Sequence, residues 1–140
     1  MAEETEAEAF LPERDEGFAG VPYVGCPATI PVGSDSYPGT VVDTGRTTVR
    51  YQFLDRDGNT VVLNMPRTIT VRDDEYRGVK DFSNAYTEAQ RYQYLAFPEG
   101  PTSKWSWRPR LGRYVQVGSG GRRSQGLGLG FRRAYRDPHF

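Results

Sequence analysis

Hydrophobic and polar residues alternate along several short segments of this 140-residue chain. The clearest segment spans residues 47–54, where Val49, Tyr51 and Phe53 fall on one face and polar side chains on the other. The Asp-Arg-Asp-Gly-Asn stretch at residues 55–59 follows, and Asp-Gly or Gly-Asn tolerates the positive φ of a tight turn. Residues 60–63 are therefore expected to pair back as the second strand of a hairpin.

Other segments carry the same strand pattern, bounded by glycine, proline and polar turns. We expect strands at residues 28–32, 40–43, 68–72, 91–97, 104–108 and 114–117. Only residues 84–90 favour helix, for one or two turns capped by Ser83 or Asn84. The predicted fold is mainly β (α+β with little helix): a small antiparallel SH3-like curled sheet, followed by a β-rich, loop-rich C-terminal half.

Charge divides the chain into a tail and one domain. Residues 1–16 contain seven acids and one arginine, a balance of −6, and have few apolar side chains. Such a composition is typical of disordered segments. We expect an acidic, disordered tail over residues 1–19 and a single β-rich ligand-binding domain over residues 20–140. The tail is either solvated or shields the basic end of the chain.

The opposite end of the chain is basic. Residues 104–140 hold nine bases against one acid, a balance of +8, and arginines outnumber lysines sixteen to two in the whole sequence. Arginine forks suit phosphate or carboxylate and stack on rings. A GC-rich genome would equally explain the arginine preference, although it would not explain the clustering.

Several classes of protein and site are disfavoured. Cys26 is the one cysteine and His139 the one histidine, so neither a structural metal site nor an intramolecular disulfide is expected. No signal sequence or apolar run of membrane-spanning length occurs, which predicts a cytoplasmic protein without membrane contact. No catalytic motif is recognisable, so we expect neither an enzyme nor a cofactor.

Arginines interleaved with aromatics remain as the main candidate chemistry. One group lies within residues 105–114 and includes Trp107, Arg108 and Arg113, and a second lies within residues 131–140 and includes Arg133. Rings stack on bases, and guanidinium groups bind phosphate oxygens. The alternative interpretation is that the aromatics form core and the arginines are solvated; the pattern leaves both open.

Three short motifs resemble those of a set of small phage proteins. The first is Gly-Cys-Pro-Ala-Thr at residues 25–29 with Ser-Asp-Ser-Tyr-Pro-Gly-Thr-Val-Val at 34–42, and the second is Gln-Arg-Tyr-Gln-Tyr at 90–94. The third is the closing Leu-Gly-Phe-Arg-Arg-Ala-Tyr-Arg-Asp-Pro-His-Phe at 129–140. The set is similar to the type-one Thoeris anti-defence proteins, phage sponges that sequester cyclic ADP-ribose isomers and, in some cases, cyclic oligonucleotides.

The resemblance implies a β-rich homo-oligomer, from dimer to hexamer, in the cytoplasm of the infected bacterial host. It implies a cyclic nucleotide ligand that is bound without cleavage. By matched position it places Arg132 and Tyr135 in the pocket, with Gln90 and Tyr92 on a facing strand. Two other functions stay open: a nucleic-acid-binding SH3-like module, which the zero net charge makes less favoured, and a phage structural or assembly protein.

Overall fold

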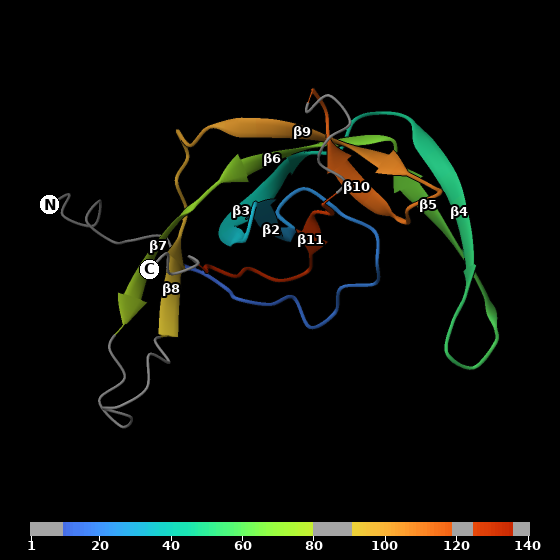
Figure 1. Ribbon diagram of the computed structural model, residues 1–140, viewed down its shortest axis with the longest axis horizontal. Helices are drawn as coiled ribbons and strands as arrows, with labels where there is room; N and C mark the ends of the chain where they lie inside the picture. The colour runs from blue at the N-terminus through green and yellow to red at the C-terminus, as the bar shows by residue number, and fades with distance from the viewer. Residues whose placement is uncertain (1–9, 80–90, 119–124, 136–140) are drawn as a thin grey trace, which may run out of the picture.

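The computed structural model describes residues 10–79, 91–118 and 125–135, and the fold is mainly β. No helix occurs in these three ranges, so none there could cross a membrane. The strands form a curled antiparallel sheet with a smaller sheet at one end and a hairpin at the other (Figure 1). The expectation of a mainly β chain with a curled antiparallel sheet is confirmed.

The curled sheet has six strands in the order β10-β9-β6-β3-β2-β11. They are β2 (Pro27–Val32), β3 (Asp35–Asp43), β6 (Thr68–Asp73), β9 (Thr102–Arg108), β10 (Arg113–Gln116) and β11 (Gly128–Leu129). Its two edge strands approach each other, because the N–H of Leu127, just before β11, donates to the carbonyl of Tyr114 in β10 at 3.0 Å. The sheet therefore encloses its inner face almost as a barrel does.

The inner face of this sheet forms the core. Strand alternation directs Trp105 and Trp107 of β9 inward, where they meet Ile69 and Val71 of β6 and Tyr114 of β10. Trp105, Ile69, Val71 and Tyr114 are each about 1% exposed or less. Burying each of these side chains stabilises the fold by roughly 1.5–3 kcal/mol, so the core fixes the curl of the sheet.

The smaller sheet begins almost directly after a strand of the larger one. It has the order β1-β8-β7, with β1 (Phe10–Leu11), β8 (Arg91–Leu95) and β7 (Glu75–Val79). Only Asp74 separates β6 from β7, and this side chain is buried at the bend. The chain therefore passes from the larger sheet to the smaller one at a residue whose carboxylate is buried.

The hairpin is a separate two-stranded sheet of β4 (Thr48–Leu54) and β5 (Thr60–Pro66). Its register pairs Tyr51 with Leu63 and Val49 with Met65, so the predicted apolar face of residues 49, 51 and 53 is continued by β5. Val49, Tyr51, Leu63 and Met65 pack against the core, and the distal part extends beyond it (Figure 1).

The structure differs from the sequence prediction at three places. Strand β3 begins at Asp35, five residues before the strand expected at 40–43, because residues 35–39 pair with β2. The ladder with β6 starts only at Gly39, and the Pro38 carbonyl accepts the N–H of Asp74 at 3.0 Å. Residues 10–19, expected in the tail, lie against the sheets, because Glu13 and Asp15 exchange backbone hydrogen bonds with the C-terminal segment. Strand β7 lies at residues 75–79, where no strand was expected. The predicted helical turn at 84–90 lies outside the described residues.

Candidate functional site

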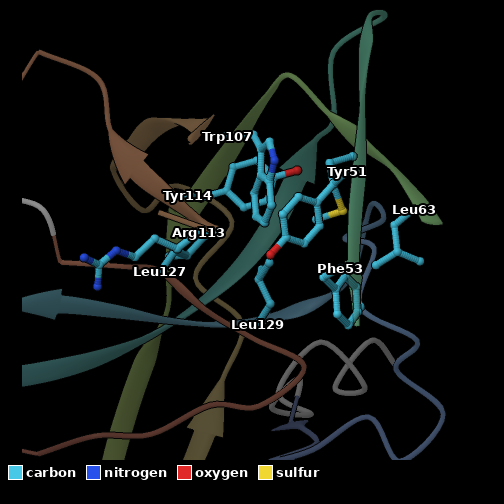
Figure 2. A pocket seen from close by; sticks show the side chains of 11 residues that line it. Tyr51, Phe53, Leu63, Trp107, Arg113, Tyr114, Leu127 and Leu129 are labelled. Atoms are coloured by element: carbon cyan, nitrogen blue, oxygen red, sulfur yellow. The ribbon is translucent and has the colours of Figure 1, made fainter. Parts of the chain in front are cut away.

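A cavity of about 240 Å³ opens at the end of the curled sheet beneath the hairpin (Figure 2). Its lining is mostly apolar and comes from the hairpin, β9, β10, β11 and the segment before β2. The lining residues are Gly20, Tyr51, Phe53, Leu63, Met65, Trp107, Gly112, Arg113, Tyr114, Leu127 and Leu129. The cavity therefore lies at the mouth of the barrel-like sheet, which is a frequent place for ligands.

Four aromatic rings form a continuous row along this cavity. Phe53 stacks on Tyr51 at 5.3 Å, Tyr51 meets Trp107 edge to face at 4.9 Å, and Trp107 meets Tyr114 edge to face at 4.9 Å. The Tyr114 hydroxyl donates to the Pro66 carbonyl at 2.7 Å, and burial raises the pKa of Tyr114. The hydrogen bond therefore fixes Tyr114 at the buried end of the row, and Tyr51 and Phe53 place the hairpin over the opening of the cavity.

One hydrogen-bond donor of the row has no partner among the described residues. Nε1 of Trp107 is buried without a hydrogen bond, and the half-buried Tyr51 contributes its hydroxyl to the same row. Gly112 makes room for this hydroxyl, since a Cβ there would lie 2.9 Å from it. An unpaired buried donor is costly and uncommon, which makes this wall suited to a ligand that carries acceptors.

Arginines border the cavity on the β9–β10 side. Arg113 leaves the cavity with its guanidinium pointing away from the rings (Figure 2), and its stem packs on Gly126, where a Cβ would lie 2.6 Å from Cδ. Arg108 is its direct cross-strand partner, and no described carboxylate pairs with either side chain. Like charges directly opposite on two strands repel, so this pair favours a bound anion.

A second, open hollow of about 480 Å³ lies at the turn after β9. It is lined by Arg108, Pro109, Arg110 and Leu111, all exposed. The hollow adds positive charge beside the cavity. It lacks the aromatic wall that a base needs for stacking.

Arg132, which the resemblance assigns to a pocket, is buried in the interior at 2% exposure. Its guanidinium donates to the Pro12 carbonyl at 2.6 Å and to the Thr40 hydroxyl at 2.8 Å, and its Nε lies 3.9 Å from the Asp74 carboxylate. Burial lowers the pKa of Arg132, and the charge of Asp74 opposes that shift. The side chain therefore links the N-terminal segment at Pro12 and its own C-terminal segment to the bend at Asp74, and it does not line the cavity.

Of the remaining predicted site residues, Tyr92, Arg133 and Tyr135 lie by the smaller sheet. The Arg133 guanidinium lies over the ring of Tyr135 at 5.4 Å, and both side chains are exposed. Tyr92 contacts Tyr76 edge to face at 5.6 Å. Gln90 lies outside the described residues. The structure thus groups Trp107, Arg108 and Arg113 at one end of the molecule, and Tyr92, Arg133 and Tyr135 at the other.

The prediction of the site missed the contribution of the hairpin. Alternation marked Tyr51 and Phe53 as one face of a strand, but no local signal says that this face covers Trp107, more than fifty residues later. The cavity-lining glycines were a signal that the sequence offered, since glycine tolerates positive φ and leaves room for a neighbour. Both have positive φ, and Gly112 lies next to the ring of Tyr51 and Gly20 next to the Leu63 side chain.

In the described part of the chain, no three His, Cys, Asp or Glu side chains gather as a metal site. The comparisons with protein-family models, curated proteins and solved structures found no match to this chain.

Proposed function

We propose that the protein binds and sequesters a cyclic nucleotide signal, a cyclic ADP-ribose isomer or a cyclic oligonucleotide, without cleaving it. The observation that carries the proposal is the aromatic row of the cavity with arginines at its border. Rings that stack on a base contribute about 1–3 kcal/mol each, and guanidinium groups pair with phosphate. This combination fits a base inside the cavity and phosphate outside.

The size of the cavity determines how much of the ligand it takes. At about 240 Å³ it is smaller than the pockets of roughly 300–1,000 Å³ that enclose most small-molecule ligands. One base with its edge groups is therefore the part that enters. The ribose and phosphate groups remain at the rim, within reach of Arg113 and Arg108.

The lining supports binding without turnover. None of the eleven lining residues is an acid, histidine, cysteine, serine or lysine. The two tyrosines, Tyr51 and Tyr114, are the only side chains of the lining that commonly act as general acid–base groups, and no second such group stands beside them in it. The donors of Tyr51 and Trp107 can instead pair with ring nitrogens or carbonyl oxygens of a base.

The test is a thermal-shift and calorimetry panel of cyclic ADP-ribose isomers and cyclic di- and trinucleotides. A ligand should raise the melting temperature in proportion to its affinity, and heat denaturation should release it chemically intact. No binding by any member of the panel, or release of an altered ligand, contradicts the proposal. Stronger binding of single-stranded oligonucleotides that falls steeply with salt would favour the nucleic-acid-binding alternative.

Matched tyrosine variants locate the site. Tyr51→Leu removes a ring of the cavity wall, whereas Tyr92→Leu removes a half-buried ring of the smaller sheet. We expect Tyr51→Leu to weaken ligand affinity about fivefold or more, in line with the loss of about 1–3 kcal/mol of stacking, and Tyr92→Leu to leave affinity unchanged. The reverse pattern would move the site to the smaller sheet, near Arg133 and Tyr135.

A further inference from the structure

The outer edge of β4 carries a row of unpaired backbone groups. At the two ends of the hairpin, the N–H of Arg67 donates to the Thr47 carbonyl at 2.9 Å and the N–H of Asp55 to the Asn59 carbonyl at 2.9 Å. Hydrogen-bonded pairs alternate along an antiparallel ladder, so the odd-numbered residues of β4 face β5. The even-numbered residues therefore direct their N–H and C=O groups away from the hairpin; they are Thr48, Arg50, Gln52 and Leu54.

Within the described residues nothing pairs with this edge, because β4 and β5 form a sheet of only two strands. Figure 1 shows β4 as the outermost strand on its side of the molecule. The edge of the curled sheet at β10, by contrast, is met by Leu127. A free edge is a template for another strand, and two-stranded sheets are marginal alone.

We propose that β4 pairs antiparallel with β4 of a second copy of this chain, about a two-fold axis at Tyr51. This register uses all four outward residues, since Thr48 meets the partner's Leu54 and Arg50 meets the partner's Gln52. The two hairpins become one four-stranded sheet. Tyr51 then lies beside the partner's Tyr51 on the face that lines the cavity, so each copy extends the aromatic wall of the other.

Charge along the hairpin favours a second copy as the occupant. Residues 55–57 at the tip hold two acids and one arginine, whereas residues 46–50 at the base hold two arginines and no acid. Antiparallel pairing places the acidic tip of one hairpin next to the positively charged residues 46–50 of the partner hairpin. It also sets Arg50 opposite Gln52, so no two like charges are directly opposed along β4.

This inference does not depend on the proposed function and is tested without ligand. Gln52 and Val62 occupy the same rung of the hairpin, with their N–H groups on its two opposite outer edges. Proline at either position removes an outward N–H and keeps the β4–β5 ladder. Sedimentation should show a dimer for the native chain and for Val62→Pro, and a monomer for Gln52→Pro, with circular dichroism confirming that both variants fold.

A monomeric native chain at all concentrations overturns the inference, as does a dimer that survives Gln52→Pro but not Val62→Pro. If Gln52→Pro fails to fold, cysteine cross-linking decides. At the two-fold axis, opposed residues have Cα atoms about 4.5 Å apart, within the range of a disulfide. Tyr51→Cys should therefore oxidise to a covalent dimer, while Phe53→Cys, whose two copies would lie more than ~10 Å apart, should not. Equal cross-linking of both, or of neither, contradicts the register.

Discussion

Replacing Arg132 with methionine tests whether this arginine is part of the interior framework or of the ligand site. Arg132 is only 2% exposed. The substitution keeps most of its apolar stem and removes the guanidinium, which donates to the Pro12 carbonyl and to the Thr40 hydroxyl. It also removes the nearest charge on the Oδ2 side of the Asp74 carboxylate. The Oδ1 side keeps its ion pair with Arg72 at 2.8 Å.

The magnitude follows from these contacts. Breaking a buried ion pair typically costs about 3–5 kcal/mol, and hydrogen bonds from charged donors about 1.5–3 kcal/mol each. Because Asp74 keeps Arg72, and because water can reach the exposed Pro12, we expect a value near the lower limit. Arg132→Met should therefore lower the free energy of unfolding by about 3 kcal/mol and the melting temperature by about 10 °C.

The assay is urea unfolding of the ligand-free protein, followed by tryptophan fluorescence. Arg133→Met is the matched control, since this neighbouring arginine is exposed and should change stability by less than about 0.5 kcal/mol. The reasoning is refuted if Arg132→Met unfolds at the native midpoint yet no longer binds ligand, because that result would make Arg132 a ligand contact. Equal losses in both variants would also contradict it.

Two further predictions concern the bend between the sheets. Burial, together with the charge of Asp74, raises the pKa of Asp73, so the stability linked to this carboxyl is present at low pH and lost as the pH rises through the raised pKa. Asp73→Asn should thus have a higher free energy of unfolding than the native chain at pH 7, and the difference should shrink below about pH 4. Urea titrations at several pH values measure it. A difference that grows on acidification would contradict the raised pKa. Gly100→Ala should destabilise the fold by about 1–3 kcal/mol or more in thermal unfolding, because the new Cβ would lie 2.2 Å from the Asp73 carbonyl oxygen. Gly17→Ala is the control and should be neutral, because the atom nearest to its Cβ would be 3.7 Å away.

Much of the strand content could be predicted from local pattern. The hairpin expected at residues 47–54 and 60–63 follows from alternation and from the Asp-Gly turn, and the structure confirms the pairing and the apolar face of residues 49, 51 and 53. The start of β3 could not be predicted in this way, because Pro38 and Gly39 are turn formers and pairing with the neighbouring β2 makes them strand. Strand β7 was missed for a similar reason: its polar sequence is stabilised by pairing with β8.

The candidate site divides along the same line. Trp107, Arg108 and Arg113 were identified from composition and lie together at the cavity end of the molecule, whereas Tyr51 joined them only through the tertiary fold. Arg132 shows the opposite case. Its sequence context, an arginine among aromatics, is the same as that of Arg133, yet one side chain is enclosed by Asp74 and Thr40 and the other is exposed.

Features with a local signal can thus be recognised in the sequence: alternating strands, a tight hairpin turn, an arginine-rich end and a lack of familiar catalytic motifs. Three other features depend on the folded chain: which arginines are buried, which rings line one cavity and which strand edge is unpaired among the described residues. This division arises because a β-sheet is stabilised by ladders and side-chain contacts between residues far apart in the chain. Burial and charge pairing at any one position thus depend on partners that the local pattern does not specify.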